Sequence, residues 1–113
     1  MPSEPLFTNF FGAGATQTST QIIILKNDLV APVGLVPTYE FTPIPENRAE
    51  QSALAMLLRW LRNQDQSTDS QFVISPFEQS LEFRFSKWQR KYTCTIEIWQ
   101  DDTLSTLPNP NTI

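Results

Sequence analysis

Histidine is absent from this chain of 113 residues, and Cys94 is its single cysteine. A chain without histidine cannot form a histidine-based acid–base pair, and one cysteine cannot supply an internal disulfide or a zinc cluster. These absences remove most enzyme classes, so we expect no enzymatic activity, no cofactor, no metal and no small-molecule substrate. The lone thiol is typical of a reducing intracellular compartment, and it also fits a particle that is assembled in a cytoplasm and later released.

Charged residues are scarce as well. Eight basic and 12 acidic side chains make up 18% of the chain and give a formal net charge of −4. A lightly charged surface favours association. The net negative charge argues against nonspecific binding of a polyphosphate, although a local basic patch can exist on an acidic chain. With 40% hydrophobic residues, the composition predicts one folded domain rather than a disordered chain.

Long hydrophobic runs are missing too. No apolar run approaches the roughly 20 residues that span a bilayer. The first residues include no basic segment, and polar residues interrupt their apolar positions, so we expect no secretory signal peptide. The sequence predicts a soluble, cytoplasmic protein without a membrane partner.

One helix is clearly marked. Asn47 followed three residues later by Glu50 has the form of a capping box, and the apolar spacing after it predicts a helix over residues 48–63. Four leucines at i, i+3, i+4 and i+7 form a single stripe that should face a core. The leucines of this stripe are Leu54, Leu57, Leu58 and Leu61.

The last third of the chain alternates apolar and polar residues in the manner of β-strands. Residues 71–75, 81–86 and 92–99 each predict a strand, and the last two form a hairpin whose tip is KWQRK, residues 87–91. Before the helix, four prolines between residues 30 and 45 predict an irregular connection with a short edge strand near residues 37–41.

Together these elements predict an α+β protein in which an antiparallel sheet of three to four strands packs on one helix, with an extended N-terminal arm. We expect the arm to cover residues 1–20, the single α+β domain to cover residues 21–104, and a C-terminal tail to cover residues 105–113.

Half of the basic residues gather, with aromatic ones, around the predicted hairpin tip. Basic groups track phosphates and aromatic faces stack bases, so this composition suits single-stranded nucleic acid. The same charges suit docking onto an acidic protein surface, and a solvated tip whose tryptophan packs on the sheet edge is the third interpretation. The residues of this candidate contact are Arg84, Lys87, Trp88, Arg90 and Lys91.

Other residues that could take part in catalysis or ligand binding have simpler structural interpretations. The carboxylates fall in predicted loops, at helix ends or on the outward side of a strand, which is typical of solvated charge. Cys94 alternates with apolar residues and is expected to be a small core residue. The segment GAGA, residues 12–15, lacks the Gly-Lys-Ser/Thr of a phosphate loop and predicts a flexible joint.

The aromatic residues of the uncharged N-terminal arm need cover. A free arm with three phenylalanines would be poorly soluble, so we expect it to dock, either over its own sheet or onto a neighbouring subunit. The β-prone segment at residues 22–25 has aliphatic side chains on both faces, and two tryptophans lie off the apolar side of their elements. The candidate partner-binding residues are Phe7, Phe10, Phe11, Ile22, Ile23, Ile24, Leu25, Trp60 and Trp99.

The segments FFGAGATQTSTQIIILKNDL and ENRAEQSALAMLL, residues 10–29 and 46–58, resemble small virion proteins of tailed bacteriophages, in which uncharged Gly/Ala/Thr-rich arms precede a compact domain. The resemblance lies in composition and order rather than in a motif, and it assigns no functional residue. It implies a non-catalytic capsid, neck or tail component that is cytoplasmic during assembly and then part of the virion.

Two hypotheses follow. The first is a non-enzymatic structural or assembly protein that forms a homo-oligomer or joins a larger protein assembly. The second is a small nucleic-acid-binding or regulatory module that acts through the basic and aromatic residues of the predicted tip.

Overall fold

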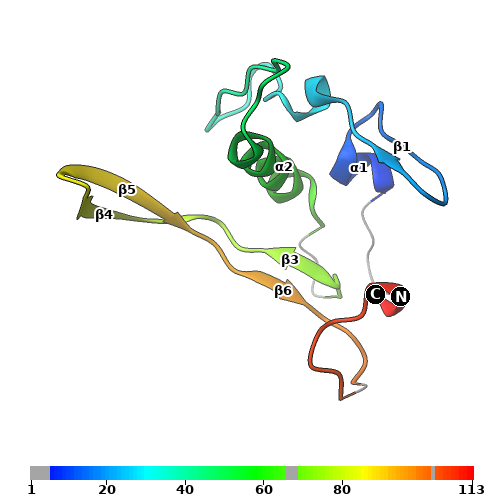
Figure 1. The fold of residues 1–113 in the computed structure, drawn as a ribbon. Coiled ribbons are helices and arrows are strands. Elements are labelled where there is room, and N and C mark those ends of the chain that lie inside the picture. Colours follow the sequence, from blue (N-terminus) through cyan, green and yellow to red (C-terminus); the bar gives the residue numbers. More distant parts are fainter. Residues whose placement is uncertain (1–5, 66–68, 103) are drawn as a thin grey trace. The chain divides into compact units, whose positions relative to one another are not determined.

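The computed structural model describes residues 6–65, 69–102 and 104–113, and the chain divides into two compact units. The first, here called the helical unit, is Pro5–Gln64, and the second, the ribbon unit, contains Asp65–Ile113. Within the described residues the main elements are helix α2 (Ala49–Asn63) and six strands, which confirms the predicted α+β class (Figure 1).

The strands pair differently from the prediction. In the described residues they form three separate two-stranded antiparallel ladders, so a single sheet of three to four strands is wrong. The reason is local, because each ladder joins segments that a hairpin brings side by side. Strand β1 (Thr16–Gln17) pairs with β2 (Ile22–Ile23), β3 (Phe72–Ile74) with β6 (Ile96–Ile98), and β4 (Glu78–Arg84) with β5 (Lys87–Thr93). The edge strand expected near residues 37–41 does not form.

The N-terminal segment is not an extended arm within the described residues. Helix α1 (Phe7–Phe11) forms because its phenylalanines are spaced i, i+3 and i+4, which places them on one helical face. The rings of Phe10 and Phe11 lie 6.0 and 6.2 Å from the Trp60 ring in α2 (Ala49–Asn63). These aromatic residues therefore cover one another within their own chain.

The glycines after α1, where the sequence predicted a flexible joint, make specific contacts with the rest of the helical unit. Gly12 ends the helix with a φ of 118°, and its N–H donates to the carbonyl of Thr8 at 2.9 Å. A Cβ atom at Gly12 would lie 2.5 Å from the side chain of Asp28. The N–H of Gly14 donates to Asp28 Oδ2 at 2.9 Å, so one carboxylate fixes this segment.

Helix α2 confirms the predicted helix to within one residue, but its cap differs. Gln51 Oε1 accepts the backbone N–H of Arg48 at 2.8 Å, so the capping interaction is one residue later than the predicted pair of Asn47 and Glu50. Asn47 instead organises the preceding loop. Its Oδ1 accepts from the N–H of Ile44 and from Lys26 Nζ, at 3.0 and 3.1 Å.

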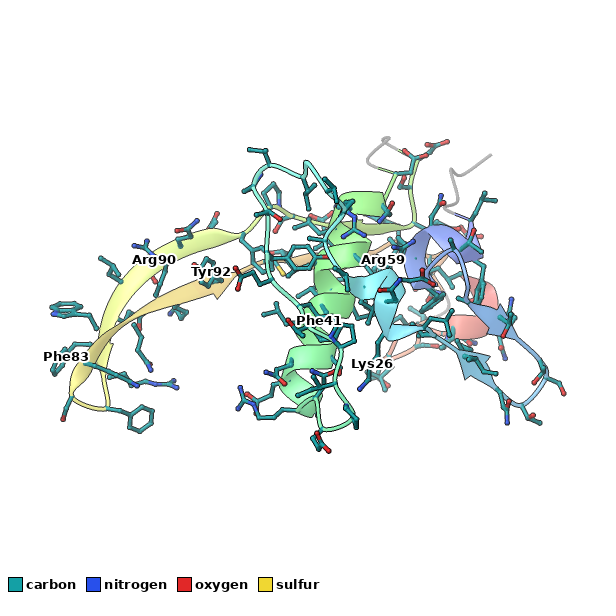
Figure 2. The ribbon with its side chains drawn as sticks, turned by 90° about the horizontal axis from the view of Figure 1, so that it is seen from above. Lys26, Phe41, Arg59, Phe83, Arg90 and Tyr92 are labelled. Carbon is teal, nitrogen blue, oxygen red and sulfur yellow. The ribbon has the colours of Figure 1, made fainter. Side chains whose placement is uncertain are left out.

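Arg59 joins three elements of the helical unit. From α2, its guanidinium donates to the carbonyl of Thr8 in α1 at 2.9 Å and to that of Asp28 in η1 (Lys26–Leu29) at 2.8 Å. Desolvation by burial, assisted by the neighbouring Arg62, lowers the pKa of Arg59, yet an arginine remains charged in proteins. Figure 2 labels Arg59 and shows it reaching from the helix. The packing of α1 and η1 on α2 therefore depends on this cation.

The two ladders of the ribbon unit lie end to end along one hairpin (Figure 1). Between them, residues 75–77 oppose residues 94–95, so the first strand contains one extra residue in the form of a β-bulge. Pro76, which has no N–H to donate, lies in this interruption. The extra residue moves the apolar positions of the first strand from even to odd numbers, while the second strand keeps even ones from Trp88 to Ile98.

The hairpin turn lies at Phe85 and Ser86, so the tip predicted at residues 87–91 is wrong and those residues belong to β5. Both turn residues have positive φ values, 54° and 61°, as a two-residue type I′ turn requires. Such a turn matches the twist of the strands and brings Phe83 against Trp88, a pair that a five-residue tip would separate.

Replacing Ser86 by glycine should stabilise the ribbon. A non-glycine residue in the left-handed region costs about 1 kcal/mol, which glycine avoids. We expect the amides of the β4–β5 ladder to exchange with solvent about fivefold more slowly in Ser86→Gly. Ser80→Gly, in the extended backbone of β4, is the matched control and should speed exchange. Equal effects of the two substitutions would contradict the assigned turn.

Replacing Arg59 by methionine should destabilise the helical unit. The change removes two charge-assisted hydrogen bonds and leaves their carbonyl acceptors short of partners, which we expect to cost about 2–3 kcal/mol. Denaturant unfolding followed by circular dichroism at the helical signal would measure the loss. Arg48→Met, at the exposed N-terminus of α2, is the control and should stay within about 0.5 kcal/mol of the parent protein.

Candidate interaction surface on the β4–β5 ribbon

The register of β4 on β5 sorts their side chains onto two faces. In an antiparallel ladder, residues directly opposite each other point to the same side, and successive residues alternate. One side, here called the apolar face, contains the pairs Gln79 with Tyr92, Leu81 with Arg90, and Phe83 with Trp88. The other, the charged face, contains Glu78 with Thr93, Ser80 with Lys91, Glu82 with Gln89, and Arg84 with Lys87.

Large side chains on the apolar face are open to solvent. Leu81, Phe83, Trp88 and Tyr92 are 59%, 64%, 70% and 58% exposed. The rings of Phe83 and Trp88 meet edge to face at 5.5 Å, and Tyr92 makes a similar contact with Phe77 at 6.1 Å. Figure 2 shows Phe83, Arg90 and Tyr92 along the ribbon. The aromatic residues contact one another while their outer surfaces remain uncovered.

The charged face is internally neutralised at its centre. Lys91 Nζ lies 2.6 Å from Glu82 Oε2, and the hydroxyl of Ser80 donates to the same oxygen at 3.0 Å. The hydrogen bond from Lys91, followed by that from Ser80, lowers the pKa of Glu82. Both members of the ion pair are solvated, so it sets the local charge more than it adds stability.

The basic residues predicted to form one contact are divided between the two faces. Arg84, Lys87 and Lys91 lie on the charged face, whereas Arg90 lies on the apolar face with Trp88. Arg90 donates to Gln79 Oε1 at 3.2 Å, and the guanidinium of Arg84 lies 4.8 Å from the centre of the Phe85 ring at the turn. A single surface that mixes all five predicted residues is not formed.

The other predicted contact residues lie in different surroundings. Phe7 packs on Phe11 at 4.9 Å, and Trp60 is half-buried against α1. Ile22, Ile23 and Leu25 are about half exposed and Ile24 is half-buried. The side chain of Trp99 is exposed, and its backbone N–H donates to the carbonyl of Gln71 at 2.8 Å. The structure thus separates these predicted residues between the two units.

Three residues of the apolar face were missed as site residues, namely Leu81, Phe83 and Tyr92. The alternation that predicted the strands already placed Leu81 and Phe83 on one side. The missing information was the two-residue turn, because without it the partners of β4 across the ladder could not be assigned. A β-branched, aromatic and basic segment such as KWQRKYT, residues 87–93, was itself a strand signal.

Chemistry-bearing groups do not converge elsewhere in the described chain. No three His, Cys, Asp or Glu residues within the described ranges are arranged to hold a metal ion. Cys94 is half-buried beside the bulge. The loop of residues 30–42 surrounds an open depression whose titratable side chains are Tyr39 and Glu40. Across the residues that the structure describes, no helix has the length and apolar character needed to cross a membrane.

Comparisons with known proteins returned no relative. No protein-family model matches the sequence, no curated protein is similar to it, and no solved structure matches its fold.

Replacing Lys91 by glutamine should raise the pKa of Glu82 toward the ordinary glutamate range. With the ion pair intact, the pKa of Glu82 in the folded state is depressed. The stability that the pair adds to the ribbon is therefore complete above the usual glutamate pKa and is lost as the pH falls through the lowered value. An NMR titration of the Glu82 side-chain carboxyl carbon would measure both proteins. Lys87→Gln, on the same face, should leave this titration unchanged, and an equal shift in both variants would contradict the assigned pair.

Proposed function

We propose that the chain is a non-enzymatic structural or assembly protein that contacts other protein chains through the apolar face of the β4–β5 ribbon. The observation that carries this proposal is the exposure of Leu81, Phe83, Trp88 and Tyr92 on one side of a two-stranded ladder. An isolated two-stranded hairpin is marginally stable in water, and an apolar sheet face is ordinarily covered. A partner protein supplies the cover that this ladder lacks.

The size of the face fits a contact surface. Large aromatic side chains bury about 150–250 Å² each, so the three rings, which are about two-thirds exposed, offer roughly 300–500 Å², to which Leu81 adds. That area reaches the upper range of the largest apolar patches on ordinary monomers, which are often functional. It also supplies about half of the roughly 800 Å² that each partner contributes to a standard interface.

The alternative is a nucleic-acid-binding or regulatory module on the same ribbon. In its favour, Arg90 shares the apolar face with Trp88 and Tyr92, which gives a cation beside two stacking surfaces. Against it, the other three basic residues lie on the opposite face, and Lys91 is paired with Glu82. Because single-strand binding needs phosphate-tracking charges and stacking rings on one side, the arrangement favours a protein partner.

A place in a phage particle is the specific form of this proposal that the sequence resemblance suggests. A capsid, neck or tail component makes repeated contacts with copies of itself or with other shell proteins, and it meets them in the cytoplasm where particles assemble. The apolar face supplies one such contact, while the aromatic residues of α1 are already used within the chain.

Removing the rings of β5 from the apolar face should reduce association. We expect the full chain to have a solution mass above that of a monomer by light scattering, and the Trp88→Ser/Tyr92→Ser variant to have a lower mass at the same concentration. Gln89→Ser/Lys91→Ser, which alters alternate positions of the same strand on the charged face, should keep the parent mass. Circular dichroism would establish that each variant remains folded.

The proposal fails if the parent protein and both variants have the same mass. A mass that falls only in the charged-face variant would also contradict it, because the contact would then lie on the opposite side of the ribbon.

A further inference from the structure

The outer edge of β4 is free to pair with another strand. Within the described chain, β5 is the ladder partner of β4 on one side, and no strand lies on the other. In a two-residue hairpin the closing pair, here Arg84 and Lys87, is joined by the turn hydrogen bond, and hydrogen-bonded pairs then alternate along the ladder. The N–H and C=O groups of Gln79, Leu81 and Phe83 therefore point away from β5.

The sequence of β4 is complementary to itself when two copies run antiparallel. With Leu81 opposite Leu81 of a second copy, the whole strand pairs, and the outward-pointing backbone groups of residues 79, 81 and 83 meet each other in register. This arrangement has a two-fold axis through Leu81, so each contact occurs twice. It places Phe83 opposite Gln79 of the second copy and leaves all apolar side chains on one side.

Charge complementarity supports the same register. Glu78 and Arg84 lie at opposite ends of β4 on the charged face, three residues on either side of Leu81. In the two-fold pair, each Glu78 comes opposite Arg84 of the second copy, at a pair that exchanges no backbone hydrogen bonds and therefore brings the side chains close. Two cross-strand ion pairs result, one at each end of the joint.

The outer edge of β5 is unsuited to the same pairing. Its residues include Lys87, Arg90 and Lys91 and no acidic side chain. A two-fold pair centred on this strand places Arg90 opposite Arg90 of the second copy, and like charges directly opposite each other are destabilising. The two edges of one ribbon are thus chemically different.

We propose that a second copy of this chain binds the free edge of β4, in the Leu81-centred antiparallel register, and forms a four-stranded sheet in the order β5–β4–β4–β5. This inference goes beyond the proposed function by naming a partner and a second contact surface, the edge of the same ribbon. The pairing raises the number of strands above the two that are marginal in water. It also joins the two apolar faces into one larger face.

A charge-exchange series on the full chain tests the register. In Glu78→Arg, arginines face each other at both ends of the joint, and in Arg84→Glu, glutamates do. Because cross-strand charge pairs are worth about 0.2–1 kcal/mol each and two are lost, we expect either change to weaken dimerisation by about two- to thirtyfold, and the new like-charge repulsion to weaken it further. The double variant Glu78→Arg/Arg84→Glu restores opposite charges and should regain most of the affinity, as measured by sedimentation equilibrium at low salt.

Disulfide trapping provides a readout that does not depend on charge. Leu81→Cys and Arg90→Cys, each with Cys94→Ser, place a single thiol at the centre of β4 or of β5, on the same face and directly opposite each other. Cα atoms in a hydrogen-bonded antiparallel pair are about 5.5 Å apart, within the range that a disulfide spans. We expect mild oxidation to crosslink Leu81→Cys into a covalent dimer and to leave Arg90→Cys monomeric.

Several outcomes would overturn the inference. They are a monomer at all concentrations, crosslinking of Arg90→Cys in preference to Leu81→Cys, growth into larger polymers, or single and double charge variants that behave alike. Its failure is distinguishable from failure of the proposed function. A mass that falls in Trp88→Ser/Tyr92→Ser but is insensitive to the charge series keeps the apolar-face proposal and overturns the β4 edge, and the reverse result keeps only the edge.

Discussion

The register of β4 on β5 is the constraint on which the rest of the ribbon depends. It is set at the turn, where Phe85 and Ser86 both occupy the left-handed region and close the hairpin with two residues. A shift of one residue would move every side chain of one strand to the opposite face. Phe83 would then lose Trp88, Lys91 would lose its place beside Ser80 and near Glu82, and no coherent apolar face would exist.

The bulge extends this ordering along the hairpin. By adding one residue at positions 75–77, the first strand changes the parity of its apolar residues at the point where Pro76 interrupts pairing. Phe72 and Ile74 precede the change, and Leu81 and Phe83 follow it. A bulge also increases the local right-handed twist. Each ladder therefore retains a matched pairing register on its own side of the bulge.

The sequence predicts the structure of some segments of this protein better than that of others. Helix α2 and the existence of strands in the last third follow from residue spacing, because apolar periods of 3.6 and 2 are direct consequences of backbone geometry. The turn was misplaced, since Phe-Ser lacks the Asn-Gly or Asp-Gly signal of a type I′ turn and its identity depends on the pairing of the flanking strands.

The N-terminal helix was missed although Phe7, Phe10 and Phe11 have helical spacing. Three aromatic residues gave too short a period to outweigh the prolines and glycines around them. The roles of Arg59 and Asp28 depend on contacts between distant residues, which no local pattern encodes.

The composition of β5 has a consequence for symmetry. In a pair joined through β4, the two edges left open are both β5, and each presents Lys87, Arg90 and Lys91. Edge strands with such charges resist further pairing, which natural sheets use to avoid unlimited growth. Addition of strands would therefore stop at two chains and give a closed assembly with one two-fold axis, whereas head-to-tail joining of unlike edges would generate an open filament. The distribution of a few cations along one strand thus sets a limit on the size of the sheet.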